Sequence, residues 1–252
     1  MQKMDLFSGH NLTKEQDIGR TITLYHGSPK QIVTPTFGRG KDNHDYGRGF
    51  YLTPNRELAM EWARGRGQDV PGWLHTYTLD CTELSVLDFE QLGKEKAIYW
   101  IAELLKHRTP DDRVTAGRRV SEKSKRFLLQ HYNCGSDSYD VVCGWRADDS
   151  YFQIAQFFLT DQLYVELLED ALRLGNLGIQ YCCKSEKAFA NLRQVCNPEA
   201  VPNRYADAFM RRDRSGRQQF YHLVDSPANS EDAPGTLLRD LVQNYQTGGG
   251  TR

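Results

Sequence analysis

A glycine-rich run near the start of the chain limits most strongly what this sequence can fold into. Residues 27–49 contain five glycines and two prolines, which interrupt helices and strands alike. This run must therefore be mostly loop. It separates two short strands, since residues 21–26 alternate with β-branched side chains and residues 49–53 form a second strand-like run. The chain thus begins with two strands and a long irregular connection, and it contains no internal repeat.

Strand and helix patterns follow one another along the rest of the sequence. Further strands are expected at 73–81, 139–145 and 179–183. Helical periodicity predicts helices at 54–67, 94–108, 121–132, 148–159, 160–175, 185–192 and 203–223. The predicted fold class is α+β, with helices inserted between strands of a mostly antiparallel or mixed sheet. In the strand at 179–183, Cys182 and Cys183 should point to opposite faces.

Charge and composition exclude several classes of protein. Lys and Arg number 32 and Asp and Glu number 33, for a net charge of -1, whereas a protein that coats DNA is normally basic. No apolar stretch approaches the roughly 20 residues that span a bilayer, and the N-terminus has no apolar signal core. The six cysteines form no CxxC pair, so we expect reduced thiols in a cytoplasmic protein. The histidines have no metal-ligand spacing, and no metal site is predicted.

Two motifs carry the chemistry that the sequence suggests. The first is His26-Gly27-Ser28, at the end of the first strand. A glycine lets a ligand approach the backbone, and the imidazole and hydroxyl can bond to sugar hydroxyl groups. The alternative is a strand-end turn with a structural histidine.

The second motif is Gly47-Arg48-Gly49-Phe50-Tyr51, followed by Trp62 on the next helix. A tyrosine and a tryptophan can sandwich a flat heterocycle between them, although aromatic side chains in such units are more often core. Arg39, Lys41 and Arg48 in the preceding loop can neutralise a pyrophosphate or can be solvated surface charges.

Together these motifs resemble the ADP-ribosyltransferase superfamily, in its diphtheria-toxin-like and poly(ADP-ribose)-polymerase-like branch. The chain also looks like a bacterial family of uncharacterised ADP-ribosyltransferase-like proteins (DUF3990-like), in which LYHGS, GxGFYLT and YDxVxGxxADD recur in this order. The last of these runs here from Tyr139 to Asp149. The resemblance covers roughly residues 22–190.

The resemblance implies a split β-sheet core with inserted helices and a division of the chain. The segments are a lead-in at 1–20, a catalytic domain at 21–195, a helical extension at 196–225 and a flexible tail at 226–252. It also implies roles in binding NAD as co-substrate. His26 and Ser28 would contact ribose, and the Gly27 backbone would hold the nicotinamide carboxamide. Tyr51 and Trp62 would stack on the nicotinamide ring, and Arg48 and Gly49 complete the cofactor-binding set.

The sequence departs from this family's pattern at the third motif, a glutamate on a late strand. The matching strand offers Gln180, whose amide can bond to a ribose hydroxyl but cannot act as a general base. We nevertheless place Gln180 with His26 and Tyr51 in the catalytic set. Asp148 and Asp149 are an alternative source of a carboxylate, and their other interpretation is a helix N-cap.

The resulting hypothesis is a NAD-dependent mono-ADP-ribosyltransferase that cleaves the nicotinamide–ribose bond. It would transfer ADP-ribose to a protein or nucleic-acid acceptor, as a bacterial toxin or effector with a cognate antitoxin or immunity protein. No membrane partner is expected. The alternatives are a non-catalytic module that binds NAD or ADP-ribose, and a NAD glycohydrolase with water as the acceptor.

Overall fold

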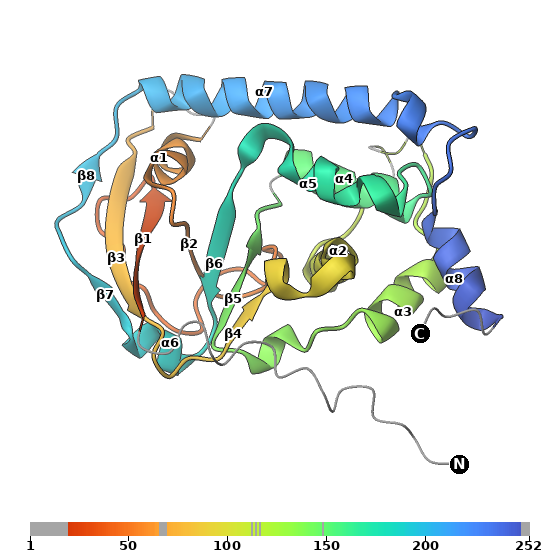
Figure 1. Cartoon of the computed structure of the whole chain (residues 1–252). Coiled ribbons are helices and arrows are strands. Elements are labelled where there is room, and N and C mark those ends of the chain that lie inside the picture. The colour runs from red at the N-terminus through yellow and green to blue at the C-terminus, as the bar shows by residue number, and fades with distance from the viewer. Residues whose placement is uncertain are drawn as a thin grey trace, which may run out of the picture.

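In the computed structural model the chain is a mixed α/β protein with two small sheets (Figure 1). The structure describes residues 20–65, 70–111, 113, 115, 117–147 and 149–247, so the predicted lead-in lies almost wholly outside the described residues. The mixed α/β class agrees with the sequence prediction. The strands form two four-stranded sheets.

The first sheet is built around β3 (Trp73–Asp80). On one side β3 pairs antiparallel with β1 (Thr21–Ser28), which places His26 opposite His75. On the other side it pairs antiparallel with two short strands, β7 (Leu192–Gln194) and β8 (Glu199–Ala200). Strands of two or three residues show no readable alternation, which explains why the sequence did not predict β7 and β8.

The second sheet has the strand order β2-β6-β5-β4. Its members are β2 (Phe50–Leu52), β6 (Ile179–Cys183), β5 (Val141–Trp145) and β4 (Val86–Asp88). All pairs are antiparallel except β4 with β5. A bridge between Tyr25 and Thr53 joins the two sheets, with reciprocal N–H···O bonds of 2.8 and 2.9 Å. The two predicted motif strands, β1 and β2, therefore lie side by side.

Eight α-helices surround these sheets among the described residues (Figure 1). They are α1 (Arg56–Arg64), α2 (Lys96–His107), α3 (Glu122–His131), α4 (Asp149–Leu159), α5 (Leu168–Arg173), α6 (Glu186–Ala190), α7 (Arg204–Val224) and α8 (Leu238–Gln246). Single 3₁₀ turns occur at Phe89–Gln91, Gly93–Glu95, Ser136–Ser138, Val165–Leu167, Leu174–Asn176 and Pro227–Asn229. None of the described helices is long and apolar enough to cross a membrane.

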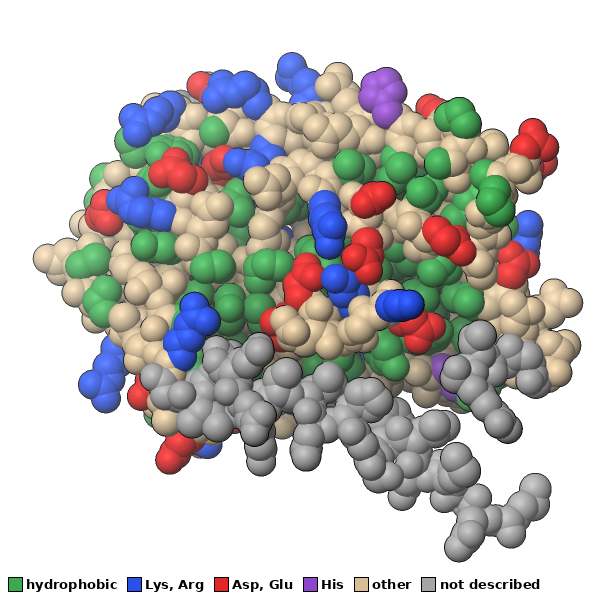
Figure 2. Space-filling view, in the orientation of Figure 1, with side chains coloured by type: hydrophobic (Ala, Val, Ile, Leu, Met, Phe, Trp, Pro, Cys, Tyr) green, Lys and Arg blue, Asp and Glu red, His purple; other side chains and the backbone are tan. Residues whose placement is uncertain are grey.

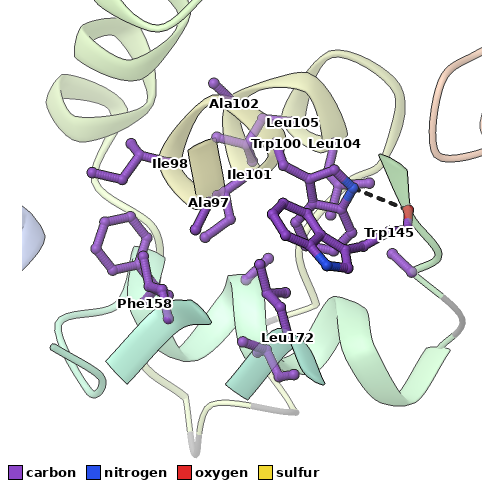
Figure 3. Packing of buried hydrophobic residues seen from close by; sticks show 14 of the residues in the cluster. Ala97, Ile98, Trp100, Ile101, Ala102, Leu104, Leu105, Trp145, Phe158 and Leu172 are labelled. Carbon is purple, nitrogen blue, oxygen red and sulfur yellow. Dashed lines mark hydrogen bonds between the residues drawn. The ribbon is translucent and has the colours of Figure 1, made fainter. Parts of the chain in front are cut away.

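The largest part of the core lies between the second sheet and the helices α2, α4 and α5 (Figure 3). The apolar face of α2 supplies Ile98, Trp100 and Ile101, all essentially inaccessible to solvent. The indole nitrogen of Trp100 donates to the carbonyl oxygen of Trp145 over 3.1 Å, the bond drawn in Figure 3. This bond satisfies a polar atom that would otherwise be costly to bury.

The adjacent cysteines of β6 lie in different hydrophobic clusters. Cys182 packs in the cluster with α2, while Cys183 packs with Leu24 and Leu52 between the sheets. The prediction that they face opposite sides is confirmed, as the pleat of a strand requires.

Several predicted boundaries are wrong. The helix α1 begins after an Asn55 cap rather than at Pro54, with the Asn55 side chain accepting from the backbone N–H of Leu58. The helix expected at 160–175 is only the 3₁₀ turn and the short α5. The segment expected as a flexible tail, with a helical turn allowed only at 236–245, carries α8, where Leu238 and Val242 are buried against the core. Apolar burial therefore orders a segment whose composition resembles a linker.

Candidate functional site

His26 lies near the end of β1 and connects the two motif strands. Its Nδ1 is 2.8 Å from the carbonyl oxygen of Tyr51, and its ring lies 4.5 Å from that of Phe50. Burial lowers the pKa of His26 to about 4, so the imidazole is neutral near pH 7. Because a carbonyl oxygen only accepts, Nδ1 must carry the proton, and Nε2 is left as an acceptor.

Gly27 is required where helix α1 crosses β1. A Cβ atom built at this position would overlap the carbonyl oxygen of Ala59 and lie 2.6 Å from the backbone nitrogen of Ala63. Any side chain would push the helix away from the strand. The neighbouring Ser28 is 6% exposed, and its hydroxyl accepts from the backbone N–H of Lys30 over 3.1 Å. The motif thus has a packing role in addition to the ligand contacts expected of it.

Tyr51 points to the side of the second sheet that contacts the large core cluster. Its hydroxyl donates to the carbonyl oxygen of Gly47 over 2.6 Å and accepts from the backbone N–H of Tyr46 over 3.0 Å. Burial raises its pKa well above 10. The tyrosine hydroxyl is therefore neutral and engaged by the preceding turn. The ring lies 5.3 Å from that of His44 and stacks on that of Tyr46 at 6.4 Å.

The two other residues of this motif have different surroundings. A Cβ at Gly49 would overlap the Sγ atom of Cys182 and lie 2.7 Å from the carbonyl oxygen of Cys183, so Gly49 permits the close approach of β6. Arg48 forms two hydrogen bonds to the carboxylate of Asp42, at 2.9 and 2.7 Å, and its side chain is 49% exposed. Arg39 and Lys41 are exposed in the same loop.

Trp62, expected to face Tyr51 across a ligand, is covered by an arginine. The guanidinium carbon of Arg146 lies 4.5 Å from the centre of the Trp62 ring. The indole Nε1 is buried and has no hydrogen-bond partner among the described residues. The Tyr51 ring contacts the rings of His44 and Tyr46 instead. The structure therefore pairs Trp62 with Arg146, which the sequence did not single out, and shows no contact between Trp62 and Tyr51 among the described residues.

Gln180 is 3% exposed, and its side-chain amide is engaged by the protein itself. Its Nε2 donates to Oδ2 of Asp45 over 2.8 Å and to the carbonyl oxygen of Trp145 over 3.2 Å. Asp45 is buried too, and it accepts from Arg108 over 3.0 Å and from the backbone N–H of Ala147 over 2.8 Å. Burial raises the pKa of Asp45.

This network gives the amide at position 180 a structural role. A glutamate at position 180 would have no N–H to donate and would place a second carboxylate against Asp45. Sequence reasoning missed Asp45, because its only signal was an acidic residue in a glycine-rich loop. Of the alternative carboxylates, Asp148 lies outside the described residues, and Asp149 begins α4.

Comparison with known families assigns the chain. A family model described as "Protein of unknown function (DUF3990)" matches residues 22–194. The chain belongs to this family. The match runs from β1 to β7 and includes His26, Tyr51, Trp62 and Gln180. No curated protein and no solved structure was found to match.

The DUF3990 region packs against a helix that lies beyond it. Tyr205 of α7 donates its hydroxyl to Glu57 of α1 over 2.8 Å, and Arg212 forms two bonds of 2.8 and 2.9 Å to Glu61. In Figure 1, α7 runs along one edge of the molecule above α1 and the α4–α5 pair. It thereby supports the helix that carries Trp62.

The candidate residues offer a particular set of chemical groups. His26 supplies a neutral acceptor, Trp62 supplies a buried indole N–H, and Arg146 supplies a cation beside the indole ring. Tyr51 adds an aromatic ring on the adjoining strand. The structure shows two contacting pairs among these groups, His26 with the backbone carbonyl of Tyr51 and Arg146 with the Trp62 ring.

Proposed function

We propose that this chain is a NAD-dependent mono-ADP-ribosyltransferase. The observation that carries the proposal is the His26–Tyr51 contact, which brings the two predicted motifs onto adjacent strands and leaves a neutral imidazole acceptor at Nε2. The arrangement of two small sheets joined along β1 and β2 supports an ADP-ribosyltransferase-like split sheet as the finer description of the fold.

In this proposal the residues bind and orient NAD rather than exchange protons with it. The Nε2 atom of His26 accepts from a ribose hydroxyl, and the Trp62 and Tyr51 rings contact the nicotinamide. The bond between nicotinamide and C1′ of the ribose breaks, and nicotinamide leaves with the electron pair. A nucleophile on the acceptor then bonds to C1′ and gives up its proton to solvent. Positioning and electrostatic stabilisation can supply much of the rate enhancement for such a step.

Gln180 favours a specific second candidate, a module that binds NAD or ADP-ribose without catalysis. Its amide nitrogen bonds to Asp45 and Trp145, and an amide has no pKa useful for activating an acceptor. Transfer to water, as in a NAD glycohydrolase, requires the least activation of the acceptor by the residue at position 180. Growth of a polymer needs the most, so we limit the proposal to transfer of a single ADP-ribose.

The setting of the activity rests on family resemblance alone. We propose on that basis that the protein acts in the cytoplasm as a bacterial toxin or effector, with a protein or nucleic acid as the acceptor. An antitoxin or immunity protein would neutralise it. Figure 2 shows Lys and Arg interspersed with Asp and Glu on the viewed face. This mixed charge suits selective contacts better than general coating of nucleic acid.

The test follows nicotinamide release and macromolecular label together. Purified protein is incubated with a cell lysate and with NAD labelled on its adenine side. The His26→Asn and Tyr51→Ala variants are compared with His222→Asn, which replaces an exposed histidine of α7. We expect label that survives denaturation in the wild type and His222→Asn only. Nicotinamide release without label would indicate a glycohydrolase, and NAD binding with neither signal would indicate the binding module.

A further inference from the structure

A polar cavity lies at the C-terminal end of α2, where it faces α4. Its volume is about 430 Å³, within the range of about 300–1,000 Å³ for small-molecule sites. The residues that matter for its chemistry are Asn43, Arg108, Thr109, Asp111, Phe152 and Gln156. None of them belongs to the predicted NAD-binding set.

One turn of the chain separates this cavity from Tyr51. Asn43 lines the cavity, while the carbonyl oxygen of Gly47 accepts the Tyr51 hydroxyl. The Cα atom of Gly47 faces the ring of His107, another lining residue, so closely that a Cβ would lie 2.6 Å from its Cε1. The turn at 43–47 is therefore a shared wall of the cavity and the candidate site.

The charges lining the cavity are compensated within the protein. Arg108 is paired with the buried Asp45 at 3.0 Å, and Asp111 is paired with Arg113 at 2.6 Å. A ligand held mainly by net charge would need an unbalanced cation or anion here. The cavity instead suits a ligand that is neutral where it is enclosed.

The remaining groups select a flat ligand with polar edges. The guanidinium carbon of Arg108 lies 4.5 Å from the centre of the ring of Phe152, which is 5% exposed, so the guanidinium and not the ring is the surface offered to a flat ligand. The Gln156 side-chain oxygen accepts from the backbone N–H of Asp111 over 3.0 Å, which leaves its amide N–H groups to donate. Asn43 is exposed and can both donate and accept.

We propose that this cavity binds a nucleobase. Guanidinium planes stack on bases, and Asn and Gln amides match the paired donor and acceptor edges that bases present. Two sources share this chemistry: the adenine of a dinucleotide and a base of a nucleic-acid acceptor. The proposal does not depend on ADP-ribose transfer, since a base can bind here whether or not the chain is a transferase.

The test measures binding of AMP, GMP, CMP, TMP and ribose 5-phosphate to the full chain by calorimetry. Thr109→Trp fills the cavity from an exposed position, and Asn43→Ala removes one amide. Asn244→Ala on α8 is the matched control, since Asn244 is also exposed. We expect at least one nucleotide to bind, with ribose 5-phosphate binding at least tenfold more weakly. The affinity of the nucleotide that binds should fall at least tenfold in Thr109→Trp and about fivefold in Asn43→Ala. It should remain unchanged in Asn244→Ala.

Further measurements identify the source of the base and overturn the proposal if it is wrong. Preference for AMP, with NAD affinity reduced by the same factor in Thr109→Trp, would assign the adenine of the dinucleotide. Preference for another base, with NAD affinity unchanged, would assign an acceptor base. Ribose 5-phosphate binding as tightly as every nucleotide, no nucleotide binding at all, or wild-type affinity in a folded Thr109→Trp would each overturn it. None of these outcomes depends on nicotinamide release, so a failure of the transferase proposal is seen separately.

Discussion

Acid should destabilise this protein through His26 before its carboxylates begin to titrate. The pKa of His26 is about 4 in the folded chain, against 6.5 for an ordinary histidine, because the ring is buried. Between pH 4 and pH 6.5 the unfolded chain therefore binds a proton at His26 that the folded chain does not bind. Stability is greatest above pH 6.5 and falls as the pH drops from 6.5 towards 4.

The size of the effect follows from the two pKa values. The full difference corresponds to about 3 kcal/mol of unfolding free energy, of which about 2 kcal/mol is lost between pH 7 and pH 5. The pKa of the buried Glu103 is about 2, so its contribution is lost below its ordinary value of 4.5. The loss at pH 5 therefore comes from histidines, since His44 and His75 share the direction of His26, while Asp45, whose pKa is raised by burial, acts in the opposite direction.

Urea denaturation at pH 7 and pH 5 isolates the His26 contribution. His26→Asn keeps an N–H that can donate to the Tyr51 carbonyl but cannot titrate. We expect the wild type to lose about 2 kcal/mol more than His26→Asn over this range. His222→Asn, at an exposed position, should behave like the wild type. Equal losses in the wild type and His26→Asn would refute the argument that burial keeps this imidazole neutral.

Three substitutions test the surrounding contacts. Gly27→Ala should abolish folding or lower the melting temperature by well over 5 °C, because its Cβ overlaps the backbone of α1; a wild-type melting curve would contradict this packing. Gln180→Glu places a carboxylate beside Asp45, so it should lower the unfolding free energy by about 3 kcal/mol at pH 7, and by less at pH 5, where one carboxyl binds a proton. Urea unfolding at pH 7 and pH 5 measures this loss. A loss that does not change with pH would exclude repulsion between the carboxylates as its cause. A double-mutant cycle of Arg146→Ala and Trp62→Leu should give a coupling of about 0.5–2 kcal/mol in unfolding free energy, and a coupling near zero would mean that the contact adds no stability.

Local pattern was sufficient to predict the longer elements of the fold. The strands predicted at 21–26, 139–145 and 179–183 are present as β1, β5 and β6, and α2 has a clear apolar face. The opposite orientations of Cys182 and Cys183 follow from strand geometry alone. The helix α8 was underestimated because its burial depends on a distant core, which composition does not reveal.

Some features of the candidate site could likewise be predicted from the sequence, and others could not. The motif His26-Gly27-Ser28 and the aromatic Tyr51 could be selected from their order and spacing, and β1 and β2 do lie together. The covering of Trp62 by Arg146 could not be predicted, because a loop after β5 delivers that arginine. The nucleobase cavity is likewise assembled from separate segments, α2, α4 and the turn at 43–47.

Gln180 shows most clearly what each level determined. The sequence by itself established that position 180 carries an amide, and therefore that this position cannot serve as a base. Only the tertiary structure decided what the amide does, since its partner Asp45 lies 135 residues away in the chain. Strand pairing and the path of the glycine-rich loop bring the two together. In that buried contact an amide can donate to a carboxylate, whereas a second carboxylate would be repelled.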